Sequence, residues 1–261
     1  MTQQRFTGRT VVITGAAGGI GSAAARRFSA EGAKLVLVDR DEQQLAAVAQ
    51  SLDGPVVTAP ADVSKETDVE RYVATAVAEF GRIDVLFNNA GVQARMRPLI
   101  EVPLEDFERT FAVNVVGMFL GLKHVLPVMF EQKSGVVVNT SSTQGLEASQ
   151  GTSAYDASKH AVAGLTKTAA LEAAPYGVRV SSVHPGPVDT AMMADIAAMR
   201  SPDNPSAAYE RASSVVPLGR LAQPDDIVNV VTFLASDEAA YISGVQYRID
   251  GGMGAAGRLA R

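Results

Sequence analysis

The stretch of sequence that decides the fold is TVVITGAAGGIG, residues 10–21. Its first part, Thr10–Thr14, predicts a buried strand, and the alanine-rich segment after the glycine turn predicts a helix that ends near Gly32. A strand, a glycine turn and a helix in this order favour a pyrophosphate site, because glycine permits φ > 0 and close backbone approach, and a helix amino terminus offers free N–H groups. A glycine-rich turn can also be a tight turn without a ligand. Whether it is a pyrophosphate site therefore depends on motifs elsewhere in the chain.

Strands and helices alternate along the remaining chain. Six further strands are predicted, at Lys34–Val38, Val56–Ala59, Ile83–Phe87, Val136–Val138, Val178–Val183 and Val245–Ile249. Helical segments separate them, which is the pattern of βαβ units in a parallel sheet. The 261 residues are enough for one sizeable core. We therefore expect an α/β fold with a single domain over residues 1–261: a Rossmann-type doubly wound parallel sheet of about seven strands, with helices on both faces.

Two long helical segments carry more apolar surface than one core needs. They run from about residue 104 to 130, with an interruption expected at Pro127, and from 155 to about 174. Apolar side chains lie on more than one face of each, which favours subunit contacts. Asn114 falls inside the first segment, where an unbonded amide would cost stability. It is either a packing device or part of a polar relay.

Tyr155 and Lys159 are the first candidates for chemistry. They stand four residues apart in an alanine-rich segment, so on a helix both project from one face. A cation beside a phenol favours the phenolate, which would lower the pKa of Tyr155 and make it a general acid or base near neutral pH. Ser142 follows the predicted strand at Val136–Val138, at the end where open α/β sheets bind ligands, and its hydroxyl could polarise a carbonyl oxygen. A Tyr-x-x-x-Lys spacing by itself also arises by chance.

Asp39 follows the second predicted strand, 18 residues beyond Gly21. A carboxylate there can accept hydrogen bonds from the adenosine ribose and would repel a 2′-phosphate, which favours NAD over NADP. Arg40 is a complication, because it could bind that phosphate or be a solvated residue at the start of the next helix. Asp62 and Val63 follow the third strand, where a loop would border the adenine, and Asp62 could also cap the following helix.

Two turns and one segment complete the predicted cleft. Residues 88–91, Asn-Asn-Ala-Gly, end the fourth strand, where small and amide residues can line a nucleotide cleft and tie backbone together. Residues 184–187, His-Pro-Gly-Pro, form a rigid turn expected near the nicotinamide. Residues 188–214 predict a mobile lid over the substrate, or a helical hairpin, which would not exclude lid behaviour. The last residues, 253–261, could fray or reach a neighbouring subunit.

Composition limits the classes of function. The absence of cysteine excludes disulfides, thiolate metal sites and cysteine nucleophiles, and it fits a reducing cytosol. The net charge of -5 argues against a nucleic-acid partner. We find neither a signal core nor a run of about 18 apolar residues, so we expect a cytoplasmic protein without a membrane segment. The histidines, His124, His160 and His184, show no ligand spacing, so we expect no catalytic metal.

Taken together, these residues resemble the short-chain dehydrogenase/reductase family over nearly the whole chain. The resemblance implies that Tyr155 exchanges a proton with the substrate oxygen, which Ser142 orients and polarises. It implies that Lys159 lowers the pKa of the tyrosine and binds the nicotinamide ribose, and that Asn114 holds a water linking Lys159 to solvent. The matching motifs are Thr14-Gly15-x-x-x-Gly19-x-Gly21, Asn88-Asn89-Ala90-Gly91, Asn114, Ser142, Tyr155-x-x-x-Lys159, and Pro185-Gly186 with Thr190.

The same resemblance implies a cofactor site for NAD and a homotetramer, because many relatives are tetramers built through the two long helices. Ala17 and Asp39 fit the NAD-using members, and Arg40 is the remaining sign of NADP. The residues expected to bind the cofactor are Gly15, Gly19, Ile20, Gly21, Asp39, Arg40, Asp62, Val63, Asn89, Tyr155, Lys159, Pro185, Gly186, Val188 and Thr190.

Within the family, the chain is similar to bacterial NAD-dependent enzymes that act on cyclic ketones and secondary alcohols, in residues 119–123 and 202–205. Few of the residues expected to face the substrate are charged, which implies a neutral, largely apolar substrate such as a ring. Those residues are Gln93, Ser142, Thr143, Gln144, Gln150, Pro187 and Met193.

Two alternatives remain at this point. The first is a 3-oxoacyl-thioester (acyl carrier protein) reductase that uses NADPH, which Asp39 and the negative net charge disfavour. The second is a non-catalytic dinucleotide-binding regulator, which the intact set of Ser142, Tyr155 and Lys159 disfavours.

Overall fold

A parallel sheet forms the centre of the molecule, as the alternation of strands and helices predicted. The computed structural model describes residues 4–255, and within that range the sheet has seven strands in the order β3-β2-β1-β4-β5-β6-β7. Each neighbouring pair of strands is parallel. The strands are β1 (Thr10–Thr14), β2 (Lys34–Asp39), β3 (Val56–Pro60), β4 (Val85–Asn88), β5 (Gly135–Thr140), β6 (Val178–Pro185) and β7 (Gln246–Ile249).

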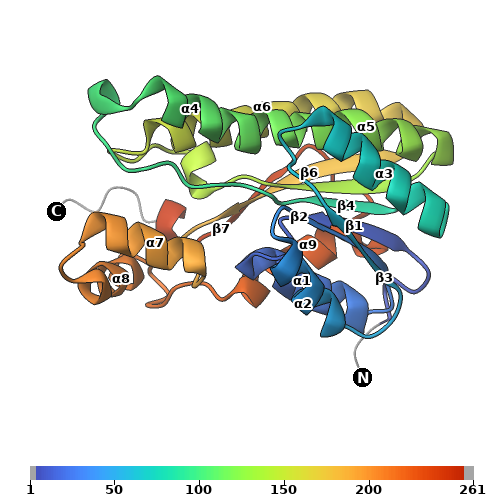
Figure 1. Cartoon of the computed structure of the whole chain (residues 1–261), viewed down its shortest axis with the longest axis horizontal. Coiled ribbons are helices and arrows are strands. Elements are labelled where there is room, and N and C mark those ends of the chain that lie inside the picture. Colours follow the sequence, from blue (N-terminus) through green and yellow to red (C-terminus); the bar gives the residue numbers. More distant parts are fainter. Residues whose placement is uncertain (1–3, 256–261) are drawn as a thin grey trace.

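Helices cover both faces of the sheet (Figure 1). Val11 and Ile13 of β1 pack against one helical layer, whereas Val12 between them packs against the other. Because both faces of β1 are buried, its sequence is a nearly continuous apolar run. The predicted doubly wound α/β fold is therefore confirmed. One layer contains α1 (Gly19–Ala30), α2 (Glu42–Gln50) and α9 (Pro224–Ala235), and the other contains α3 (Glu66–Phe80), α5 (Gly117–Gln132) and α6 (Ser153–Ala173), with α4 (Leu104–Phe111) beside it.

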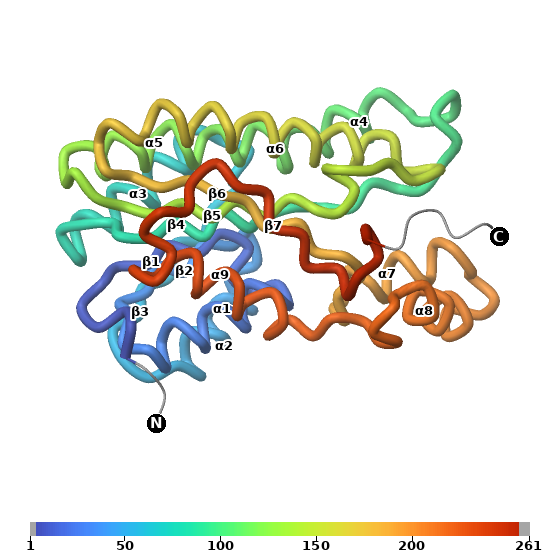
Figure 2. Tube along the Cα trace, turned by 180° about the vertical axis from the view of Figure 1, so that it is seen from behind, coloured from blue at the N-terminus to red at the C-terminus, as the bar shows by residue number. Residues whose placement is uncertain are grey.

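The segment expected to form a lid consists of two helices, α7 (Ala191–Arg200) and α8 (Pro205–Ser214), which lie together at one end of the molecule (Figure 2). Asn204 caps α8, because its side-chain oxygen accepts a hydrogen bond from the N–H of Ala207 at 3.1 Å. Tyr209 on α8 donates a hydrogen bond to Asp189, just before α7. A helical hairpin is therefore present, and its movement as a lid stays a prediction.

The interruption expected at Pro127 is wrong. Pro127 lies inside α5, on its exposed side, so the carbonyl that loses its N–H partner can face water. The irregularity lies earlier, in the π-helical turn Ala112–Val116 that joins α4 to α5 and contains Asn114. Several strand limits also differ from the predicted ones by one or two residues. For example, β4 begins later, at Val85, and β6 continues through Pro185 because its last residues pair with β7.

The continuous helical stretch Leu104–Gln132 is, by length and composition alone, apolar enough to cross a membrane. This corrects the expectation that no such run exists. Half of its most apolar window is buried inside the molecule, where α5 packs against α3 and α6, as in the core helix of a globular protein. Of the carboxyl-terminal tail, Met253–Ala255 form a short 3-10 turn. The alternatives stated for the tail otherwise concern residues 256–261, outside the described residues.

Candidate active site

The glycine turn between β1 and α1 is closed by contacts that only glycine allows. Gly15 has a φ of 67°, and a Cβ at this position would lie 2.9 Å from the Cα of Ala90. A Cβ on Gly21 would lie 2.0 Å from the carbonyl oxygen of Gly15, and one on Gly19 would lie 2.7 Å from Cγ2 of Thr190. Because these glycines have no side chains, the turn can close. The amino-terminal turn of α1 then borders a cavity, an arrangement that fits the binding of a pyrophosphate.

A cavity of about 480 Å³ extends from this turn along the carboxyl ends of β1, β4, β5 and β6. In open α/β sheets this is the edge where ligands bind. The cavity brings together most of the residues predicted to bind cofactor or substrate. Those that line it are Gly15, Gly19, Ile20, Asp39, Asn89, Gln93, Ser142, Thr143, Gln144, Tyr155, Lys159, Pro185, Gly186, Pro187, Val188, Thr190 and Met193.

Asn89 and Thr14 tie three strand ends together beside the cavity. The backbone N–H groups of Asn89 and Ala90 donate to Oγ1 of Thr14 at 2.9 and 3.0 Å. The Asn89 side chain donates to the carbonyl of Thr14 at 3.1 Å and accepts a hydrogen bond from Thr140 at 3.1 Å. β1, β4 and β5 are thereby held in register at the site, as the amide residues of this motif predicted.

Asp39 lies at the end of β2, next to the glycine turn. Its Oδ2 accepts a hydrogen bond from the N–H of Ala17 at 3.0 Å, and its Oδ1 accepts one from Asp41 at 3.1 Å. These bonds fix the carboxylate at the edge of the cavity. Arg40 is exposed and does not line the cavity. The charged group that is held in place at this end is therefore the carboxylate.

Six residues predicted for the site do not line the cavity. Gly21 lies beneath the glycine turn, where it allows the turn to close, and Gln150 is exposed. The structure therefore does not bring Gln150 together with the other residues expected to face the substrate. The six residues are Gly21, Arg40, Asp62, Val63, Asn114 and Gln150.

Asp62 and Val63 are engaged in local structure instead. Oδ1 of Asp62 accepts hydrogen bonds from the backbone N–H and the hydroxyl of Ser64 at 3.1 and 2.7 Å. The residue before α3 is Lys65, and it makes no side-chain capping bond, so the interpretation of Asp62 as the helix cap is wrong. Val63 is buried, and a Cβ on Gly117 would lie 2.8 Å from its Cγ2.

Ser142, Tyr155 and Lys159 are buried together at the centre of the site. Tyr155 and Lys159 stand one turn apart on α6, as their spacing predicted. The Nζ of Lys159 lies 5.5 Å from the centre of the Tyr155 ring and donates to the carbonyl of Thr140 at 3.0 Å. The hydroxyl of Ser141 donates to the carbonyl of Lys159 at 2.9 Å. These two bonds join the end of β5 to α6, so the catalytic candidates sit on a rigid support.

The prediction that the pKa of Tyr155 is lowered is wrong for the chain without a bound cofactor. Burial raises the pKa of Tyr155 to about 12, the nearby Ser142 side chain lowers it by less, and the Asp156 carboxylate raises it. Burial also lowers the pKa of Lys159 to about 8. Desolvation disfavours the charged form of both groups, and here it outweighs the attraction between ammonium and phenolate that the spacing led us to expect.

Asn114 is fully buried and its amide is bonded at both ends. Its Oδ1 accepts a hydrogen bond from the N–H of Val92 at 2.8 Å, and its Nδ2 donates to the carbonyl of Val92 at 3.0 Å and to Oγ of Ser158 at 3.1 Å. A Cβ on Gly91 would lie 3.3 Å from Oδ1 of Asn114 and 3.4 Å from Nζ of Lys159. Asn114 is therefore a packing device that also stands close to Lys159.

Several residues of the cavity were not singled out from the sequence. Half of them come from the two helices of the predicted lid, where apolar composition was the only signal. Arg200, at the end of α7, introduces a charge that the expectation of a neutral site overlooked. The residues are Thr140, Ser149, Met192, Ile196, Arg200, Ala212, Val215 and Met253.

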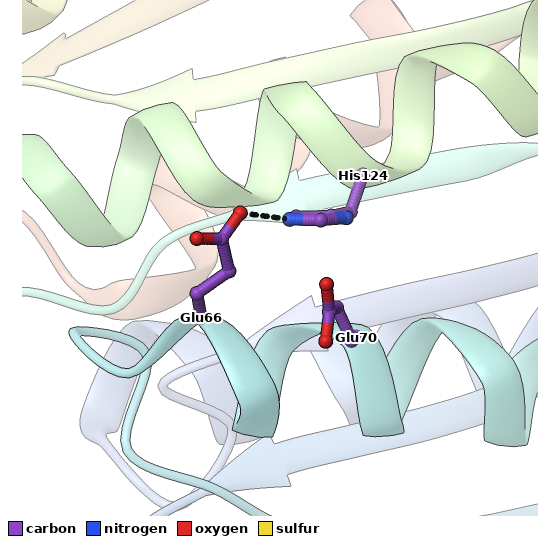
Figure 3. A group of neighbouring side chains, drawn as sticks. All are labelled: Glu66, Glu70 and His124. Carbon is purple, nitrogen blue, oxygen red and sulfur yellow. Dashed lines mark hydrogen bonds and ion pairs between the residues drawn. The ribbon is translucent and has the colours of Figure 1, made fainter.

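A separate group of possible metal ligands lies away from the cavity. Figure 3 shows Glu66 and Glu70 on α3 facing His124 on α5, with one donor atom of each within 4.8 Å of the others. Oε1 of Glu66 already accepts a hydrogen bond from Lys123 at 2.5 Å and lies 2.8 Å from Nε2 of His124. Glu66 and Lys123 form an ion pair between the two helices, and none of Glu66, Glu70 and His124 lines the cavity. The absence of a catalytic metal stays a prediction.

The chain is similar to known proteins over nearly its whole length. A family profile described as "Enoyl-(Acyl carrier protein) reductase" matches residues 15–254. Levodione reductase of Leifsonia aquatica is 43% identical over 257 residues, which are 97% of this chain and 96% of that protein. A crystal structure of levodione reductase matches with a TM-score of 0.95 at 42% identity, and covers 97% of this chain and 100% of that one.

Two further solved structures carry a nicotinamide dinucleotide. NAD+-bound xylitol dehydrogenase matches with a TM-score of 0.92 at 34% identity, covering 95% of this chain and 100% of that one. A 3-ketoacyl-(acyl-carrier-protein) reductase from Brucella melitensis, complexed with NADH, matches with a TM-score of 0.86 at 33% identity, covering 95% and 98%. The chain therefore belongs to the short-chain dehydrogenase/reductase family of oxidoreductases, as its motifs predicted.

Proposed function

We propose that the protein is an NAD-dependent dehydrogenase that interconverts a secondary alcohol and a ketone, with a neutral, largely apolar and cyclic substrate. The observation that carries this proposal is that buried Ser142, Tyr155 and Lys159 share one cavity with the glycine turn. A proton-transfer group and a dinucleotide cradle on the same cavity are what this reaction needs. The nicotinamide, when bound, supplies or accepts the hydride at the carbinol carbon.

The chain's own residues handle the proton and the position of the substrate. Tyr155 donates a proton to the carbonyl oxygen during reduction and removes it during oxidation. The hydroxyl of Ser142 donates a hydrogen bond to the same oxygen, which polarises the carbonyl. Lys159, with its Nζ 5.5 Å from the Tyr155 ring, stabilises the phenolate by its charge when it is protonated.

Asn114 would connect Lys159 to solvent through a water. Its Oδ1 keeps a second lone pair beyond the bond from Val92. Gly91 lies against both Oδ1 of Asn114 and Nζ of Lys159, and its lack of a side chain leaves space there. In this proposal the amide packs the turn between α4 and α5 against the site and also supports the proton relay.

The choice of cofactor follows from the fixed carboxylate of Asp39. We expect Asp39→Asn to lower the preference for NAD over NADP, as a ratio of kcat/KM, by about 10- to 100-fold, because like-charge repulsion of about 1–3 kcal/mol is removed. Asparagine keeps one side-chain oxygen, which can accept from the N–H of Ala17 or from that of Asp41 but not from both. Arg40→Ala is the matched control, expected to leave the ratio unchanged. A large effect of Arg40→Ala together with none of Asp39→Asn would mean that the guanidinium sets the preference.

The substrate class follows from the lining of the cavity beyond Tyr155, which includes Met192, Met193, Ile196 and Val215. The similarity to levodione reductase supports a cyclic substrate. We expect ring alcohols to reduce NAD faster than linear alcohols or 3-hydroxyacyl thioesters. Initial rates of NADH and NADPH formation across such a panel test this. Preference for a thioester with NADP would move the assignment to the acyl carrier protein reductase.

That reductase is the second candidate, because the chain also resembles the 3-ketoacyl-(acyl-carrier-protein) reductase from Brucella melitensis. Its partner would be an acidic carrier protein, which a chain of net charge -5 attracts poorly. The third candidate function, a non-catalytic dinucleotide-binding regulator, would not require Ser142, Tyr155 and Lys159. Their joint burial on the cavity supports an enzyme.

We propose a homotetramer in the cytoplasm, with neither a membrane nor a nucleic-acid partner. The helices α5 and α6 expose apolar side chains, with Phe119 46% and Leu171 78% exposed, and burial of such a surface between copies would be favourable. Light scattering after gel filtration should give four times the mass of one chain. A monomer at micromolar concentration would contradict the proposal.

A further inference from the structure

His184 is a buried histidine at the end of β6, and it touches the backbone of Ser142. Its side chain is fully buried, with Nδ1 2.8 Å from the carbonyl oxygen of Ser142 and Nε2 2.9 Å from Oγ of Ser182. A carbonyl oxygen can only accept, so Nδ1 carries the hydrogen and Nε2 accepts a hydrogen bond from the Ser182 hydroxyl. The two contacts together select one tautomer of the imidazole.

The imidazole takes over where the backbone pairing of β5 and β6 stops. The N–H of Ser141 still bonds to the carbonyl of Val183 at 2.9 Å. In this register the next N–H of β6 would come from residue 185 and would point at the carbonyl of Ser141, but residue 185 is a proline and has no N–H. The carbonyl of Ser142 lies one residue beyond this last pair, and the Nδ1–H group of His184 supplies its donor, so this carbonyl is not left unpaired inside the protein.

Both polar ends of Ser142 are then fixed. Its carbonyl accepts from His184, and its hydroxyl oxygen accepts from the N–H of Gln144 at 3.2 Å. The residue itself is extended, with φ of -164° and ψ of 163°. Without the imidazole bond, the peptide after Ser142 could rotate, and the hydroxyl would leave its place beside Tyr155.

We propose that His184 is a positioning residue, which holds the backbone of Ser142 and thereby keeps the Ser142 hydroxyl aimed at the substrate oxygen. The proposal rests on the role proposed above for Ser142. His184 does not line the cavity, so it acts through Ser142 rather than on the substrate. Burial lowers the pKa of His184 to about 4, the bond to Ser142 opposes this, and the charge of Lys159 adds to it. The imidazole therefore stays neutral and keeps its tautomer at the pH of the reaction.

Two substitutions of His184 distinguish the contribution of Nδ1 from that of Nε2. In His184→Asn the side-chain NH₂ can take the place of Nδ1 and donate to Ser142, whereas in His184→Gln it reaches the place of Nε2 instead. We expect His184→Gln to lower kcat by about 10- to 100-fold with little change in the Kd for NADH, because the carbonyl of Ser142 loses its donor. His184→Asn should stay within about threefold of the parent, which makes it the rescue variant.

The same substitutions in a Ser142→Ala chain test whether His184 acts through Ser142. We expect His184→Gln to cost nothing further there, because effects that pass through one residue are not additive. An equal loss in both chains would show a general structural role and overturn the proposal. Equal activity of His184→Gln and the parent would overturn it as well.

Measurements that do not depend on catalytic activity can test the positioning role of His184 separately from the proposed function. The ¹⁵N shifts of the imidazole should report hydrogen on Nδ1 across pH 6 to 9, and hydrogen exchange of the Gln144 amide should accelerate in His184→Gln but not in His184→Asn. An inactive parent chain with these signals intact would refute the dehydrogenase alone. Hydrogen on Nε2, or unchanged exchange at Gln144 in His184→Gln, would refute the positioning role whatever the activity.

Discussion

Tyr155→Phe should lower kcat by about 100- to 10,000-fold in both directions, because the reaction loses its proton donor and acceptor. The phenylalanine ring fills the same buried space, so the cavity and the glycine turn should stay intact. We therefore expect the Kd for NADH, measured by fluorescence titration, to change by less than about twofold. Initial rates with the best substrate of the panel give kcat. Turnover that stays near the parent value would refute the acid–base role.

The matched control is Tyr176→Phe. Tyr176 follows α6 and stacks on Phe130 with ring centres 4.0 Å apart. Phenylalanine keeps that stacking, and the residue lies outside the cavity, so activity should be unchanged. Loss of activity in both variants would point to a fault in the protein samples rather than to the chemistry of Tyr155.

The pH dependence has a definite sign. Burial raises the pKa of Tyr155 to about 12, and oxidation of an alcohol requires the phenolate. The rate of oxidation should therefore rise with pH until the phenol titrates in the complex, while reduction should be flat below that pH. A positive charge from Lys159, or from an oxidised nicotinamide, would lower that pKa and move the rise toward neutral pH. Oxidation rates that fall as the pH rises from 6 to 9 would contradict this assignment.

Gly21→Ala should cost the fold at least about 3 kcal/mol, because the turn cannot close around a side chain. A Cβ at this position would lie 2.0 Å from the carbonyl oxygen of Gly15 and 2.9 Å from the Cα of Ala16, both of them backbone atoms that cannot swing away. Urea denaturation followed by circular dichroism measures the loss. The Kd for NADH should also rise, since the displaced turn would enter the pyrophosphate site.

Gly18→Ala is the control within the same turn. Its Cβ would meet only the carbonyl oxygen of Gly15, at 3.4 Å, which is an ordinary contact, and its φ is -73°. We expect its free energy of unfolding to stay within about 0.5 kcal/mol of the parent. Equal destabilisation by the two substitutions would mean that the turn resists any added methyl group, rather than being closed at Gly21.

The fold could be predicted from patterns of neighbouring residues along the sequence. The run Thr10–Thr14 has an apolar centre at Val11–Ile13 because β1 is covered on both faces. The glycines that follow mark a backbone approach that other residues exclude. Tyr155 and Lys159 could be paired because four residues make about one helical turn. These conclusions depend on spacing along the chain, so the sequence determines them by itself.

The tertiary structure decided what depends on neighbours that are distant in sequence. The sequence did not show the partners of the Asn114 amide, which are Val92 and Ser158. Pro127 did not end its helix, because the side where it lies faces water. His184 had no visible partner in the sequence, since the carbonyl that it holds lies 42 residues away.

The direction of the Tyr155 pKa is the clearest case. Spacing placed Lys159 beside the phenol, which predicts a lower pKa, but the chain folds around both groups and removes water from them. Desolvation depends on the whole packed surroundings, whereas spacing reports one pair only. The sequence by itself determined which groups meet at the site. Only the tertiary structure decided how strongly burial opposes their charges.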